Sequence, residues 1–179
     1  MVCTDKIRSC FTAAIVTFVF IIPNSINAAQ PQQPAIASAH PLATQAGYLI
    51  FERGGNAFDA AIAVSAVLSV VEPYSSGLGG GAFFLIHREQ DKYQTFIDAR
   101  EKAPNAATAE MYQDTQGMVI PRASLVGPLA SGIPGLPAGL VHLSNKYGAL
   151  PLEQSLAAAI ELAEKGFPVY ERLNTALKV

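Results

Sequence analysis

The chain has 179 residues, of which 50% are apolar and 15% are charged, and its formal net charge is −2. This balance is typical of a globular protein with a sizeable core, and it excludes an intrinsically disordered chain, which combines low hydrophobicity with high net charge. The 12 Lys and Arg side chains are matched by 14 Asp and Glu side chains. With no basic excess to neutralise a phosphate backbone, nucleic acid is not an expected partner.

Residues 1–29 are predicted to be a secretory signal peptide. Lys6 and Arg8 precede the apolar run Phe11–Ile22, and the small pair Ala28–Ala29 follows it. This order of charged region, apolar region and small-residue cleavage site is typical of exported proteins. The apolar run is shorter than the about 20 residues that span a bilayer, so a stable membrane anchor is not expected. We expect a periplasmic or secreted protein.

Cysteine and histidine usage argues against a metal centre. Both cysteines, Cys3 and Cys10, lie in the predicted signal peptide, which leaves the mature part without a disulfide, a thiolate metal site or a Cys nucleophile. The histidines His40, His87 and His142 are scattered and show no HExxH or paired spacing. We therefore predict no metal ion and no other cofactor.

Folded structure is expected to begin after a short linker. Residues 30–36 are rich in Pro and Gln and favour an extended conformation, so residues 37–179 form the predicted folded part. Pro41 is placed as the first residue of a helix that stops before Gly54–Gly55.

A second helix is expected over residues 57–72. Asn56 is its predicted cap, and Asp59 lies in the first turn, where the helix dipole favours a negative charge. The helix is apolar around most of its circumference, which predicts burial between layers of an α/β arrangement.

An antiparallel hairpin is predicted next, with strands Phe83–Ile86 and Tyr93–Ala99 around a polar turn. The glycines before it lie between a helix end and a strand start. A phosphate-binding loop has the opposite order and a Lys–Ser/Thr pair, so nucleotide binding is not expected. We instead expect tight turns or a close approach between layers at Gly77, Gly79, Gly80 and Gly81.

Three more helices are expected beyond the hairpin. A short one is predicted over 105–112 and is followed by a loop or strand region over 115–129. Another ends near Tyr147 with Gly148 beyond its end, and the last runs over 151–165 before Gly166 and Pro168. No element is predicted after it.

Arg100 follows the second predicted strand and stands between Asp98 and Glu101. The residues alone leave two interpretations open. A surface Arg paired with a neighbouring carboxylate contributes little to stability. Alternatively, a guanidinium fork held at a strand end donates two parallel hydrogen bonds to a ligand carboxylate.

Five segments follow one another in order and at close spacing: GGNAFDAAIAV, SGLGGGAFFLI, IDAREKAP, ASGIPGLPAGL and YGALPLEQSLAAAIELAEKGFPV. The glycine segment alone is a weak signal, whereas five segments in the right order are specific. Together they resemble the N-terminal part of the gamma-glutamyltransferase family, also called gamma-glutamyltranspeptidase or glutathione hydrolase. The resemblance covers about residues 37–179.

The resemblance implies an N-terminal nucleophile hydrolase with an αββα sandwich, of which only the N-terminal part of the large subunit is present. Such a proenzyme, or zymogen, cuts itself into a large and a small subunit. The new N-terminal Thr of the small subunit attacks the gamma-glutamyl amide, with its own α-amine as base. Water or an acceptor amino acid or peptide then takes the glutamyl group. The implied partners are glutathione or a related gamma-glutamyl compound, the acceptor and the small subunit.

The resemblance also assigns a role to Arg100, because the family's arginine in the motif matched by IDAREKAP binds the α-carboxylate of the glutamyl group. Ala99 stands where many members have Phe. That departure changes the packing beside the guanidinium and leaves its hydrogen-bond donors in place.

The family's cleavage-site Thr opens a Thr-rich segment followed by His, and no segment here matches it. We therefore expect a fragment with no catalytic residue of its own, inactive alone. Two alternatives stay open. One is a truncated, non-catalytic amino-acid-binding protein, or a subunit that pairs with a separate chain. The other is a related glutaryl- or cephalosporin-type acylase, whose N-terminal half is similar.

Overall fold

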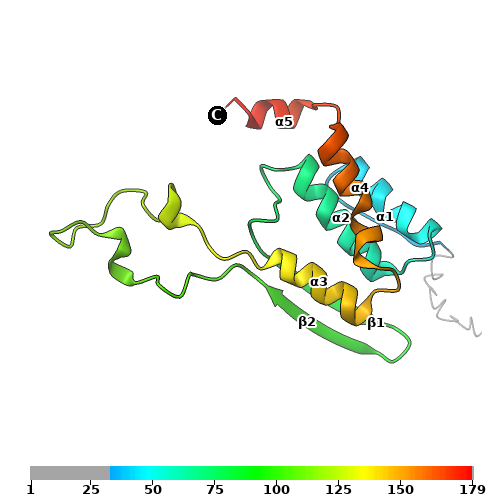
Figure 1. Cartoon of the computed structure of the whole chain (residues 1–179). Helices are drawn as coiled ribbons and strands as arrows, with labels where there is room; N and C mark the ends of the chain where they lie inside the picture. The colour runs from blue at the N-terminus through cyan, green and yellow to red at the C-terminus, as the bar shows by residue number, and fades with distance from the viewer. Residues whose placement is uncertain (1–32, 179) are drawn as a thin grey trace, which may run out of the picture. The chain divides into compact units, whose positions relative to one another are not determined.

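The computed structural model describes residues 33–178, so the predicted signal peptide lies outside the described residues. Helices α1, α2, α3, α4 and α5 and the strands β1 and β2 follow the chain as coloured in Figure 1. Their bounds are α1 Pro41–Glu52, α2 Ala57–Val71, β1 Ala82–Arg88, β2 Tyr93–Ala99, α3 Leu136–Tyr147, α4 Leu152–Lys165 and α5 Glu171–Ala176, with short 3-10 turns at Ala109–Tyr112 and Pro128–Ala130.

The first two helices are confirmed, together with the predicted Asn56 cap of the second. His40 Nδ1 accepts a hydrogen bond from the Leu42 N–H at 3.2 Å, just before Pro41 begins α1. The Asn56 side chain accepts from two N–H groups of the first turn of α2, and the Asp59 carboxylate accepts from the Asn56 N–H at 2.9 Å. This reciprocal arrangement is a capping box, which satisfies N–H groups that have no partner inside the helix.

Helix α2 is buried between other elements, as its all-round apolar surface predicted. One side of it packs against α1 and α4 in a cluster that includes Ala63 and Val67, both almost fully buried. From another side Ile62 reaches a second cluster formed by the hairpin and α3. Figure 1 shows α2 among α1, α4 and α3, with the hairpin beyond α3. The described chain is therefore a mixed helix and sheet structure organised around α2.

The hairpin is also confirmed. β1 and β2 are antiparallel and pair from Ala82 with Ala99 to Arg88 with Tyr93. Ile86 is buried in the cluster with α3, and Phe84 and Ile97 pack against it from the same face. Because Ala82 pairs with Ala99, the start of β1 and the end of β2 lie side by side.

Asp59 does more than the first-turn preference predicted. Its side chain is fully buried, and it accepts hydrogen bonds from the N–H groups of Ala149 at 2.9 Å and Leu150 at 3.4 Å. Beside it, the Asn56 side-chain amide donates to the Tyr147 carbonyl at 2.7 Å. The cap of α2 thus holds the connection between α3 and α4.

Two expectations were wrong or incomplete. Of the short helix expected over 105–112, only a 3-10 turn at Ala109–Tyr112 forms, and no residue of it is buried. Short helices need a packed apolar face, and the segment between β2 and α3 runs away from the other elements (Figure 1). The unpredicted α5 is too short for its periodicity to show, although it buries Leu173. No helix within residues 33–178 has the length and apolar character needed to cross a membrane.

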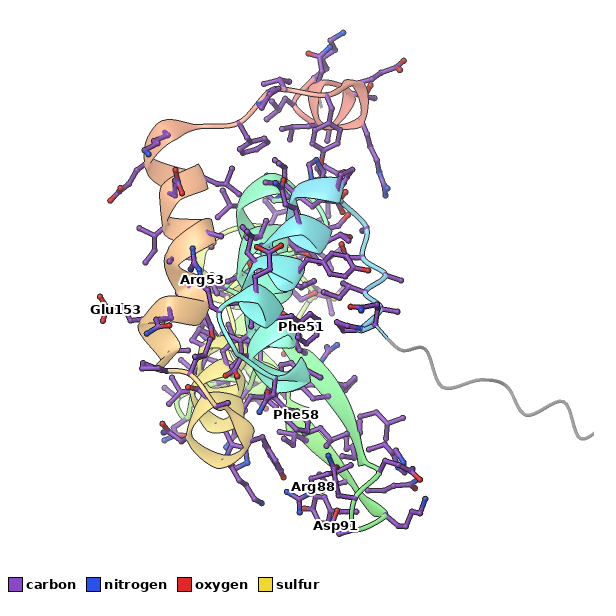
Figure 2. All side chains as sticks on the ribbon, turned by 90° about the vertical axis from the view of Figure 1, so that its right-hand side faces the viewer. Phe51, Arg53, Phe58, Arg88, Asp91 and Glu153 are labelled. Atoms are coloured by element: carbon purple, nitrogen blue, oxygen red, sulfur yellow. The ribbon has the colours of Figure 1, made fainter. Side chains whose placement is uncertain are left out.

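Replacing Asp59 by Asn is expected to lower the free energy of unfolding by about 2 to 3 kcal/mol. Both carboxylate oxygens of Asp59 accept hydrogen bonds from backbone N–H groups. Whichever way the Asn side chain is turned, its NH2 group replaces one of these oxygens and leaves a backbone N–H without an acceptor. Urea unfolding of the chain measures the change. Glu153→Gln is the control, because Glu153 is exposed on α4 and projects outward (Figure 2); an equal effect of both substitutions would contradict the role of Asp59.

Candidate functional site

Three segments that are distant in sequence meet at the end of the hairpin where β1 starts and β2 ends. The Gly80 carbonyl accepts hydrogen bonds from the N–H groups of Gly135 and Leu136, both at 3.1 Å. Next to this contact, Lys102 and Ile133 exchange two backbone hydrogen bonds of 3.0 and 2.7 Å. The glycine segment, the Arg100 segment and the start of α3 are thereby fixed to one another.

The close approach that the sequence predicted is confirmed at Gly81. A Cβ atom there would lie 2.5 Å from Arg100 Cα and 2.7 Å from the Glu101 nitrogen. At Gly135 a Cβ atom would overlap the carbonyl oxygens of Ala99 and Arg100. Because backbone atoms cannot rotate away as side chains do, these two positions require glycine.

A cavity of about 530 Å³ opens beside these contacts. Its wall comes from α2, from the loop between α2 and β1, from the residues just after β2 and from the start of α3. The lining residues outside α2 include Tyr74, Ser75, Ser76, Arg100, Glu101 and Leu136.

Arg100 lies at this cavity with its side chain about half exposed (56%). Its Nη2 donates to Glu101 Oε1 at 2.7 Å, and its Cζ lies 5.6 Å from the centre of the Phe83 ring. Its backbone N–H donates to Asp98 Oδ1 at 2.9 Å. The structure thus contains the pairing with a neighbouring carboxylate and also includes Arg100 among the residues that line a cavity. A guanidinium carries five N–H donors, so the contact with Glu101 leaves donors for a ligand.

At the other end of the hairpin, Arg88 and Asp91 form a bidentate pair between a guanidinium and a carboxylate. Arg88 donates from Nε to Asp91 Oδ1 at 2.9 Å and from Nη2 to Oδ2 at 2.6 Å. The two side chains lie together at the turn in Figure 2. The hydrogen bonds from Arg88 lower the pKa of Asp91 to about 2. Bidentate pairing of this kind strongly favours an ionised carboxylate.

Sequence reasoning identified Arg100 and the glycines of the site, and missed the rest of the wall. Ser75 and Ser76 directly precede the glycine segment, and Glu101 directly follows Arg100, so adjacency was the available signal. Tyr74 lies one residue before Ser75, but its hydrogen bond with Tyr170 joins residues 96 positions apart, for which the sequence contains no signal. Within residues 33–178 no group of three or more His, Cys, Asp or Glu side chains is placed to hold a metal ion.

Comparison with known proteins identifies the family. The family model described as gamma-glutamyltranspeptidase matches residues 43–179. The chain therefore belongs to the gamma-glutamyltranspeptidase family, as the five segments predicted.

Individual relatives agree with this membership. The chain is 42% identical to a glutathione hydrolase proenzyme of Bacillus subtilis over 143 residues, which are 79% of this chain and 24% of that protein. The crystal structure of Helicobacter pylori gamma-glutamyltranspeptidase matches with a TM-score of 0.76 and 41% identity, over 83% of this chain and 43% of that one. A cephalosporin acylase from Bacillus halodurans matches with a TM-score of 0.66 and 34% identity, over 82% of this chain and 29% of that one. The chain spans about a quarter of the length of the curated relatives that it matches.

Replacing Gly81 by Ala is expected to lower the free energy of unfolding by about 1 to 3 kcal/mol, since the new methyl group would force the backbone at Arg100 aside. Gly79→Ala is the matched control, because a Cβ atom at Gly79 meets nothing within 4 Å. That control is expected to change stability by about 0.5 kcal/mol or less. Urea unfolding compares the two; similar losses at both positions would refute the close approach.

Proposed function

We propose that the chain forms the N-terminal part of the large subunit of an exported gamma-glutamyltransferase, active in glutathione catabolism. The enzyme cleaves the gamma-glutamyl bond of glutathione and related compounds and passes the glutamyl group to water or to an acceptor amino acid or peptide. The observation that carries the proposal is the position of Arg100 at the cavity closed by the glycine segment, in a chain whose relatives are glutathione hydrolase proenzymes.

Arg100 binds the α-carboxylate of the glutamyl group in this proposal. The bidentate Arg88–Asp91 pair shows the hydrogen-bond geometry that such a complex would adopt. Glu101, the present partner of the Arg100 guanidinium, would share it with the substrate carboxylate. The residue that attacks the amide is the N-terminal Thr of the small subunit, so the residues of this chain bind and orient the substrate.

The αββα sandwich is part of the same proposal, and the outer face of the hairpin supports it. Phe83, Leu85 and Phe96 point away from α3 and are 56%, 85% and 57% exposed, and the two Phe rings lie 5.3 Å apart. Strands that are apolar on both faces are typical of a sheet covered on both sides. A second sheet of the complete enzyme would cover this face.

An acylase of the glutaryl or cephalosporin type is the second candidate, favoured by the similarity to the Bacillus halodurans enzyme. The two functions differ in the substrate group beside the scissile amide. A gamma-glutamyl group carries an α-amine and an α-carboxylate, whereas a glutaryl group lacks the α-amine. Export through residues 1–29 as a signal peptide is common to both.

The function is tested in a hybrid enzyme, the Bacillus subtilis proenzyme in which residues 37–178 of this chain replace the matching segment. Arg100→Lys is expected to raise KM for gamma-glutamyl-p-nitroanilide about 10- to 100-fold, since Lys keeps the charge but has no planar fork. Arg88→Lys is the matched control at the far end of the hairpin and should leave KM unchanged. An unchanged KM in the Arg100→Lys enzyme would exclude the carboxylate-binding role.

The same hybrid separates the two candidate functions. Gamma-glutamyl-p-nitroanilide and glutaryl-p-nitroanilide are offered as alternative substrates, and kcat/KM is compared. A gamma-glutamyltransferase is expected to prefer the first. Preference for the glutaryl compound would support the acylase instead.

The sandwich is tested at Leu85, because its environment should differ between the chain alone and the hybrid enzyme. Leu85→Ala is expected to change the free energy of unfolding of the 179-residue chain by less than about 1 kcal/mol, as for an exposed strand residue. In the hybrid enzyme the loss should be about 2 to 4 kcal/mol, typical of a buried Leu. Urea unfolding measures both, and equal small losses would argue against a covering sheet.

A further inference from the structure

A cluster of hydrogen-bonding side chains lies against the cavity wall and shares one lining residue, Tyr74, with it. It consists of Glu72 at the end of α2, Tyr74 in the following loop and Tyr170 just before α5. Glu72 is only 4% exposed although it carries a carboxylate. Its Oε1 accepts a hydrogen bond from the Tyr74 hydroxyl at 3.1 Å, and the Tyr170 hydroxyl oxygen lies 3.5 Å from the same atom. Buried carboxylates are retained where hydrogen bonds satisfy them.

Tyr170 connects this cluster to two helices. Its hydroxyl donates to the Val71 carbonyl at 2.7 Å, one of the last carbonyls of α2, which have no partner inside the helix. Its ring lies 4.9 Å from the ring of His40, the cap of α1. Burial and the hydrogen bond with Tyr74 raise the pKa of Tyr170 above its ordinary value, so the hydroxyl stays a donor throughout the neutral range.

The loop that Glu72 begins is the loop that lines the cavity. The Glu72 carbonyl accepts from the N–H groups of Ser75 and Ser76, both at 2.9 Å. These two serines and Tyr74 line the same cavity as Arg100. A shift at the end of α2 would therefore displace that wall, while Arg100 itself is held from the other side by the contact at Gly81.

We propose that Tyr170 is a positioning residue for the substrate pocket: through Val71, Glu72 and Tyr74 it fixes the Ser75–Ser76 wall at the distance from Arg100 that a gamma-glutamyl group requires. Tyr170 does not line the cavity and acts only through these residues. The substrate class rests on the proposed function, whereas the mechanical link from Tyr170 to the wall does not.

The test compares Tyr170→Phe with Tyr48→Phe in the hybrid enzyme. Tyr48 on α1 is the matched control, because among residues 33–178 its hydroxyl accepts a single hydrogen bond, from the Ile36 N–H at 3.4 Å. In Tyr170→Phe, amide hydrogen exchange in the peptide covering residues 73–81 is expected to accelerate. KM for gamma-glutamyl-p-nitroanilide is expected to rise about two- to tenfold, as for the loss of one hydrogen bond, with kcat changed by about twofold or less.

Each outcome decides one claim. If exchange at residues 73–81 in Tyr170→Phe matches that in the Tyr48→Phe control, the mechanical link is wrong. If exchange is faster but KM is unchanged in an active hybrid, the positioning role is wrong. If the unsubstituted hybrid has no gamma-glutamyl activity, the proposed function fails and the exchange rates still decide the link. Glu72→Gln is a second variant of the same network and should change exchange and KM in the same direction, so the test does not depend on one substitution.

Discussion

The site depends on the two hydrogen bonds that the Gly80 carbonyl accepts from the N–H groups of Gly135 and Leu136. They join the loop after α2 to the start of α3, and the end of β2 is held between them. A Cβ atom fits at neither Gly81 nor Gly135, because backbone atoms of residues 99–101 fill the space beside both glycines. The position of Arg100 is therefore set by main-chain geometry, which side-chain rotation cannot relax.

At the N-terminal end of α2, a buried carboxylate likewise joins segments that are distant in sequence. Asp59 caps α2 and also holds the turn between α3 and α4. The central helix α2 therefore helps to fix the directions of α3 and α4. Glu72 at the opposite end of α2 is likewise buried and hydrogen-bonded. Helix α2 thus carries an ionisable side chain at each end, and each contacts a segment far along the chain.

Local patterns predicted the elements whose signals are local. Asn56 with Asp59, the alternation over Tyr93–Ala99 and the stop at Gly148 each depend on residues a few positions apart, and each was confirmed. The hydrogen bonds of Tyr170 join it to partners up to 99 residues away, for which a single sequence contains no periodic signal. The helix expected over 105–112 was mostly wrong because its residues have nothing to pack against. The carboxylate-binding role of Arg100 stays a prediction from the family resemblance, since spacing alone left its role open.

The segment between β2 and α3 has a further consequence. Its two ends are joined by the reciprocal backbone bonds of Lys102 and Ile133, so the residues between them form a closed excursion from the fold. Lengthening such a loop costs little, about 0.6 kcal/mol of closure entropy for each doubling. The excursion is therefore free to diverge in length and sequence during evolution while Arg100, two residues before its base at Lys102, stays in place.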